Sequence, residues 1–279
     1  MQSRFIFLAL VGLAPLLVAT QDQTPPQAPE GQQPIQGPDP LADLALVFEA
    51  QGIDLDLPRS RVSIPVQVGV TNDLLEYLLV GPQGAAHETL LITAVDPEIL
   101  NAAFLTLGAK PGSNADWHRK DPMPSQEEID AGVSPYDVTV PAGMGFFLYV
   151  GWREEGEDYL YRMEDLVRDR FRGRTLRRHR FVYLGSKMVQ RGEDGPETFA
   201  AALNGNLINV SFFKEGFTLL TTALPECVDQ SAWLANAWLL PARGSEVRLI
   251  FSKDRLPHGL GKGAHLPEVL TIPDPGGGR

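Results

Sequence analysis

Residues 61–70 read RVSIPVQVGV, and the alternation of their side chains decides the class of fold. Valine or isoleucine stands at every second position from Val62 to Val70, with smaller or polar residues between. An extended chain points successive side chains to opposite faces, so this period of two is typical of a strand with one buried face. β-branched residues also favour strands. The stretch therefore predicts a half-buried strand in a protein built around a sheet.

Further strand patterns lie on both sides of one clear helix start. Asp96-Pro97-Glu98 is typical of a helix N-terminus, because aspartate caps the first turn and proline favours its first position. Strands are expected at residues 74–80, 89–93, 145–153, 159–163, 181–184, 199–202, 207–213 and 247–251, and helices at 41–51, 97–107 and 230–238. The sequence predicts an α+β fold, mainly antiparallel β-sheet with one or two helices packed on it.

The first twenty residues have the composition of a secretory signal peptide. Arg4 supplies a positive charge, and residues 5–18 form an apolar run. The polar residues 21–23 end that run before it reaches the roughly 20 residues that a membrane-spanning helix needs. We expect cleavage near residues 19–20, no stable transmembrane segment afterwards, and an exported, periplasmic or extracellular protein. The alternative is an uncleaved N-terminal anchor.

Two segments lack the apolar residues that a folded core needs. Residues 21–40 contain six glutamines and six prolines, with Ile35 as the only large apolar side chain, so burial cannot offset the entropy of ordering. They predict a disordered tether. Residues 255–279 end in PDPGGGR and predict a flexible tail. Between these segments, residues 41–254 predict a single α+β domain.

The charge and the cysteine content exclude several classes of function. The chain has 35 acidic and 24 basic residues, a formal charge of −11, which disfavours general nucleic-acid binding. Cys227 is the only cysteine. It cannot form an internal disulfide, a zinc site with several thiolates or an iron–sulfur cluster held by the chain's own thiolates. The sequence predicts no cofactor and no metal site.

His87 and Glu88 are the best candidates for catalysis, because they follow a glycine-rich turn at residues 81–84 and enter a strand at its rim. Neighbours in a strand face opposite ways, so both can meet one ligand only across a bulge. Ser186 and Asp165 complete the candidate set, although Ser186 lacks the flanking glycines of a nucleophile elbow. The simpler interpretation is a turn histidine beside a glutamate in a surface ion pair.

Residues 168–180 carry seven arginines against Asp169 alone, in a chain that is acidic as a whole. Such a segment binds an anionic partner, such as an acidic glycan or an envelope protein, or pairs with the chain's own acids, for example at residues 154–158. The predicted anion- or partner-binding residues are Arg170, Arg172, Arg174, Arg177 and Arg178.

Several short motifs, taken together, resemble the YdjY-type domain found in exported proteins of planctomycetes and other bacteria. They are EYLL (76–79), HETLL (87–91), GAKPG (108–112), MEDLVR (163–168), FVYLGS (181–186), NLINV (206–210) and LPARGSEV (240–247). The resemblance covers about residues 55–252. It implies an exported protein and supplies no reaction, since that family has no known function. Leu166 and Phe181 stand where such domains tend to have tryptophan, and their bulk and apolarity imply a packing role.

Two functions remain open at this point, beside a purely structural role in which the matched positions preserve a core. The first is a non-catalytic module outside the cytoplasm that binds an envelope protein or a glycan, because no catalytic spacing is intact. The second is an exported hydrolase or metal-dependent enzyme that uses His87 and Glu88. Geometry separates them, since catalysis requires the candidate side chains to lie within hydrogen-bond reach or one water apart.

Overall fold

A computed structural model describes residues 40–190, 192, 195–256 and 260–263. These residues belong to one compact unit that begins at Pro40. The predicted signal peptide (1–20), nearly all of the predicted tether (21–40) and most of the predicted tail (255–279) lie outside the described residues. In the described part of the tail, the strand β18 (Gly261–Lys262) pairs with β8 (Glu157–Arg162).

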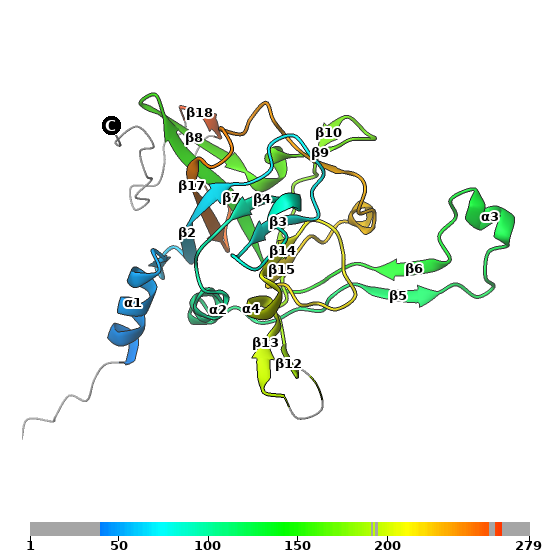
Figure 1. The fold of residues 1–279 in the computed structure, drawn as a ribbon, viewed down its shortest axis with the longest axis horizontal. Helices are drawn as coiled ribbons and strands as arrows, with labels where there is room; N and C mark the ends of the chain where they lie inside the picture. The colour runs from blue at the N-terminus through cyan, green and yellow to red at the C-terminus, as the bar shows by residue number, and fades with distance from the viewer. Residues whose placement is uncertain (1–39, 191, 193–194, 257–259, 264–279) are drawn as a thin grey trace, which may run out of the picture. The chain divides into compact units, whose positions relative to one another are not determined.

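Eight strands close into a barrel (Figure 1). Starting from β2, the hydrogen-bonded neighbours follow one another as β4, β3, β14, β15, β11, β7 and β17, and β17 pairs with β2 again. The β3–β4 and β14–β15 pairs are parallel. The barrel strands are β2 (Arg61–Val68), β3 (Tyr77–Val80), β4 (Thr89–Ile92), β7 (Gly145–Glu154), β11 (Phe181–Tyr183), β14 (Asn206–Asn209), β15 (Leu220–Thr221) and β17 (Glu246–Ser252).

The predicted α+β class is therefore wrong, and the fold is mainly β. The physical reason is that β17 bonds along both of its edges, to β2 and to β7, so that the sheet closes on itself instead of offering an open face to helices. The α-helices of the described chain are short: α1 (Pro40–Ala50), α2 (Pro97–Thr106), α3 (Gln126–Asp130) and α4 (Ala200–Asn204). In this part of the chain no helix combines the length and the apolar character needed to cross a membrane.

The two strongest local predictions are confirmed. Val62, Ile64, Val66 and Val68 are all buried in β2, as the period of two requires. The helix α2 begins at Pro97, and the Asp96 carboxylate accepts hydrogen bonds from the N–H groups of the next turn, at 2.7 and 3.3 Å. The buried face of α2 packs into the barrel core, where Phe104 meets aromatic rings of β7, β11 and β17.

The expected helix at residues 230–238 is wrong, since this segment contains the strand β16 (Trp233–Ala235). Trp233 and Ala235 are buried on either side of the half-buried Leu234, a period of two that a helix would not give. β16 pairs with β9 (Val167–Asp169), which also pairs with β10 (Arg174–Thr175). These three strands form a small separate sheet that displays the arginine-rich segment.

The remaining elements are short. The polar excursion at residues 110–142 forms a hairpin of β5 and β6 with α3 between them, which extends away from the barrel (Figure 1). The other strands are β1 (Asp54–Asp56), β5 (Asp116–Arg119), β6 (Tyr136–Thr139), β12 (Met188–Gln190) and β13 (Glu197–Phe199), and the 3-10 turns are η1 (Ala86–Glu88), η2 (Met163–Leu166) and η3 (Pro225–Val228).

Candidate functional site

Four of the five predicted anion-binding arginines pair with the chain's own carboxylates. These acids come from η2, β9 and η3, not from residues 154–158. The hydrogen bonds from Arg177 lower the pKa of the Glu226 carboxyl to about 2. The positive charge of these four arginines is therefore largely neutralised by ion pairs within the fold. The pairs are Arg172 with Asp169 (2.7 Å), Arg174 (3.4 Å) and Arg177 (2.5 Å) with Glu226, and Arg178 with Asp165 (2.8 Å).

Two other arginines of the segment lie over exposed aromatic rings. The guanidinium carbon of Arg168 is 4.3 Å from the ring centroid of Trp238, and that of Arg170 is 4.9 Å from the ring of Phe171. Trp238 is 76% exposed and Phe171 is 61% exposed. Within the described residues, neither arginine forms an ion pair. We call these four residues the arginine–aromatic surface.

The strand β9 positions this surface. Asp169 is buried, where it accepts hydrogen bonds from the N–H groups of Phe171 and Arg172, both at 3.0 Å. Side chains alternate along a strand, so Arg168 lies on the face opposite the buried Asp169, and the exposed Arg170 begins the turn that follows β9. The sequence prediction included Arg170 but missed Arg168 and Trp238. The alternation of inward and outward side chains along the strand that contains Asp169 is the sequence signal that points to Arg168.

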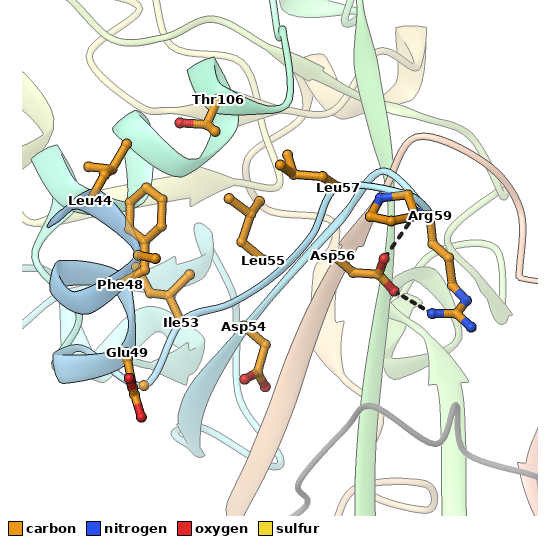
Figure 2. Close-up of a pocket in the computed structure, with 13 residues that line it drawn as sticks. Leu44, Phe48, Glu49, Ile53, Asp54, Leu55, Asp56, Leu57, Arg59 and Thr106 are labelled. Atoms are coloured by element: carbon orange, nitrogen blue, oxygen red, sulfur yellow. Dashed lines mark hydrogen bonds and ion pairs between the residues drawn. The ribbon is translucent and has the colours of Figure 1, made fainter. Parts of the chain in front are cut away.

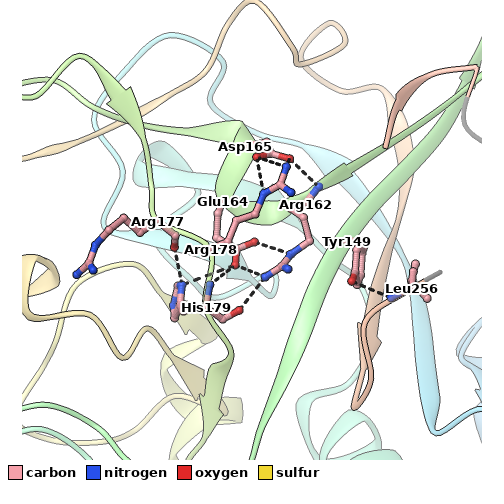
Figure 3. Close-up of polar contacts among 8 residues, drawn as sticks. All are labelled: Tyr149, Arg162, Glu164, Asp165, Arg177, Arg178, His179 and Leu256. Atoms are coloured by element: carbon pink, nitrogen blue, oxygen red, sulfur yellow. Dashed lines mark hydrogen bonds and ion pairs between the residues drawn. The ribbon is translucent and has the colours of Figure 1, made fainter. Parts of the chain in front are cut away.

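A buried polar network anchors the arginine-rich segment to the barrel (Figure 3). The Arg162 guanidinium donates to the Glu164 carboxylate at 3.0 Å and to the His179 carbonyl at 2.7 Å. The His179 N–H donates to the same carboxylate at 2.9 Å. Burial raises the pKa of Glu164, while the Arg162 charge opposes the shift. This network ties β8 and η2 to the chain just before β11.

Two of the candidate catalytic residues, Ser186 and Asp165, are held by structural hydrogen bonds. The Ser186 hydroxyl donates to the Phe217 carbonyl at 2.6 Å and accepts from the Ala201 N–H at 3.1 Å. The Asp165 carboxylate accepts from Arg178 and from the Arg162 N–H. In the described part of the chain, no hydrogen bond or ion pair joins either residue to His87 or Glu88. The structure therefore does not assemble these four candidates.

His87 and Glu88 do contact each other, because they lie on the 3-10 turn η1 and not on an extended strand. The His87 Nε2 atom is 3.3 Å from Glu88 Oε1, and the His87 side chain is 78% exposed. Burial and the neighbouring Glu88 carboxylate raise the pKa of Glu76. Among the residues that the structure describes, no group of three or more His, Cys, Asp or Glu side chains is placed to hold a metal ion.

Replacing His87 with alanine is expected to change the free energy of unfolding by less than about 0.5 kcal/mol, because an exposed side chain loses little on truncation. The midpoint of thermal unfolding should move by less than about 2 °C. Phe104→Ala is the reference for a buried residue, with an expected loss of about 3–5 kcal/mol. A fall of more than about 1 kcal/mol for His87→Ala would show that the side chain stabilises the fold.

A mostly apolar pocket of about 600 Å³ lies between α1 and the β1–β2 hairpin (Figure 2). The side chains of Leu44, Phe48, Ile53 and Leu55 line it. Two of the three carboxylates that line it already have partners, since Asp56 pairs with Arg59 and Asp54 with Arg248, and the Glu49 carboxylate forms no ion pair among the described residues. One unpaired carboxylate is fewer than the several convergent polar groups that fix a ligand's orientation.

The comparison with protein families supports the resemblance found in the sequence. The family model described as the YdjY domain matches residues 53–252. This range begins one residue before β1 and ends on the last residue of β17, so it contains the closed barrel and the strands attached to it, except β18. No match was found among curated proteins or among solved structures. The family match covers most of the chain, which therefore belongs to the YdjY domain family.

Proposed function

We propose that this chain is a non-catalytic, exported binding module whose arginine–aromatic surface binds an acidic glycan. The observation that carries the proposal is Trp238, which is 76% exposed and lies against the Arg168 guanidinium. The signal-like composition of residues 1–20 supports export. In the described chain, Ser186 and Asp165 form structural hydrogen bonds and none to His87 or Glu88, which supports a binding role over an enzymatic one.

The chemistry of the surface suits an acidic glycan. A sugar ring offers an apolar face that packs on an exposed indole or phenyl ring. The carboxylate of an acidic sugar accepts paired hydrogen bonds from a guanidinium, which is planar and always charged. Arg168 and Arg170 offer such groups beside two rings, without a carboxylate partner in the described chain. Arg168 lies in β9, and Arg170 follows the end of this strand directly.

The test is a calorimetric titration of the chain with polygalacturonate, and with dextran as the neutral glycan. We expect binding of polygalacturonate only, and weaker binding at high salt because exposed charges are screened. Trp238→Ala and Arg168→Ala should each weaken it by about tenfold or more. Arg119→Ala is the matched control, since it removes an exposed arginine on the β5–β6 hairpin.

Three results would overturn the proposal. One is equal binding of dextran and polygalacturonate, which would mean that the glycan's charge is not recognised. Another is binding of polygalacturonate that Arg119→Ala weakens as much as Arg168→Ala does, which would indicate a diffuse charge effect. The third is the absence of binding to polygalacturonate at low salt, where electrostatic attraction is strongest.

A further inference from the structure

A second, smaller pocket of about 180 Å³ lies where β3 begins, between β14 and residues 213–218. It is formed by Tyr77 of β3, by asparagines in and before β14, and by side chains of the 213–218 segment. Its size suits a small group and not a drug-sized molecule, since sites for the latter measure roughly 300–1,000 Å³. We call it the Tyr77 pocket.

Aromatic rings form much of the wall of the Tyr77 pocket. The rings of Tyr77 and Phe213 are stacked, with centroids 5.5 Å apart and planes 10° apart, and Phe217 adds a third ring. The chain's own ammonium groups already lie over rings nearby. The Nζ atom of Lys187 is 4.6 Å from the Phe217 centroid, and that of Lys214 is 5.4 Å from the Tyr136 centroid. Rings in this region thus attract cations.

Of the described chain, one carboxylate lines the same pocket. Glu215 lines it, and no lysine, arginine or histidine is among the described residues that do. Burial, followed by the charges of Glu76, Glu88 and Glu215, raises the pKa of Tyr77 to about 12. Within the described residues, Glu215 forms no ion pair. An unpaired carboxylate beside aromatic rings favours a cation over a neutral molecule or an anion.

Two of the asparagine side chains that line the pocket already form hydrogen bonds within the fold. The Asn209 side chain is already used, since it donates to the Ser211 carbonyl and accepts from the Thr218 hydroxyl at 3.1 Å. The Asn206 oxygen accepts from the Ala85 N–H at 3.1 Å, which holds the turn before η1 against β14. The groups left to meet a ligand are therefore the rings, the Glu215 carboxylate and the Asn204 side chain.

We infer that the Tyr77 pocket binds an organic ammonium ion, held by the rings of Tyr77 and Phe213 and by the Glu215 carboxylate, while the Phe217 ring already has the Lys187 ammonium group over it. The inference is independent of the glycan proposal, because it concerns a different surface with the opposite charge. The ammonium group could belong to a small molecule or to a lysine side chain of a peptide, and the two sources share the same chemistry.

The test is a calorimetric titration of the full chain with three probes. Choline represents a free ammonium ion. Nα-acetyl-lysine amide, with its side-chain ammonium group free, represents a peptide side chain. The alcohol 3,3-dimethylbutan-1-ol is the uncharged molecule of the same shape as choline. We expect at least one of the two ammonium probes to bind about tenfold or more tightly than the alcohol. Which of them binds better identifies the source.

Three variants make the result specific to the pocket. Glu215→Gln removes the lining carboxylate from an exposed position and should weaken binding about fivefold or more. Tyr77→Ala should abolish binding, and Glu215→Gln remains informative if Tyr77→Ala fails to fold. Glu127→Gln on α3 makes the same charge change elsewhere and should leave binding unchanged. The inference would be overturned if neither ammonium probe binds more tightly than the alcohol, if neither binds at all, or if Glu215→Gln and Glu127→Gln lose binding equally.

Discussion

Replacing Glu164 with leucine is expected to lower the free energy of unfolding by about 3–5 kcal/mol, which is the cost of leaving one member of a buried ion pair without its partner. Glu164 is fully buried, and it accepts hydrogen bonds from the Arg162 guanidinium and from the His179 N–H. Without it, a buried positive charge and a backbone donor lose their acceptor. The midpoint of thermal unfolding should fall by roughly 10 °C or more.

Two further variants separate the ion pair from other effects. The double variant Arg162→Met, Glu164→Leu removes both charges, and we expect it to lose less stability than Glu164→Leu alone. Asp165→Asn removes the next carboxylate along the chain, whose partner Arg178 is half-exposed, and we expect a loss of at most about 1 kcal/mol. If the double variant is less stable than the single one, the buried charge on Arg162 is not the cause of the loss.

Lowering the pH from 6.5 to 4 is expected to destabilise the fold through His179. Burial lowers the pKa of this histidine from 6.5 to about 4 in the folded state. The unfolded chain therefore binds more protons in this window, and the free energy of unfolding falls as the pH falls. The expected loss is about 2 kcal/mol by pH 5 and about 3 kcal/mol by pH 4, with the full stabilisation present above pH 6.5.

The measurement is denaturant unfolding at several pH values, for the natural chain and for His179→Phe. The phenyl ring keeps the packing against Phe181, whose ring centroid is 4.4 Å from that of His179, and it does not titrate. The variant should lose most of the pH dependence between 6.5 and 4. Glu226, with a pKa of about 2, changes the free energy of unfolding only below about pH 4.5, so its contribution can be separated from that of His179. An unchanged pH profile in His179→Phe would contradict the assignment.

Local features of the fold could be predicted from the sequence because the residues that decide them are close together. The β2 strand follows from its own alternation, and the start of α2 follows from Asp96 and Pro97. Closure of the barrel could not be predicted in this way. It depends on β17 pairing with β2 and β7 at once, and no local pattern specifies which distant edges a strand will meet. The same limit led to the incorrect α+β class.

The candidate site, too, could be predicted only in part from the sequence. The concentration of arginines at residues 168–180 is visible in the sequence, but the partners that neutralise four of them come from three separate elements. Only the folded chain shows that Arg168 meets Trp238. The contact between His87 and Glu88 depends on a 3-10 turn, where the sequence suggested the start of a strand.

The position of β17 in the barrel has a consequence for how the chain is made. Residues 61–68 are synthesised long before residues 246–252, and yet these two strands form one of the longest ladders in the molecule. Until β17 is available, β2 and β7 each present an unpaired edge, and such edges pair readily with other chains. Contacts this distant in sequence also slow folding, because a long loop must close before they form. A nascent or truncated chain that ends before Glu246 should therefore be prone to aggregate.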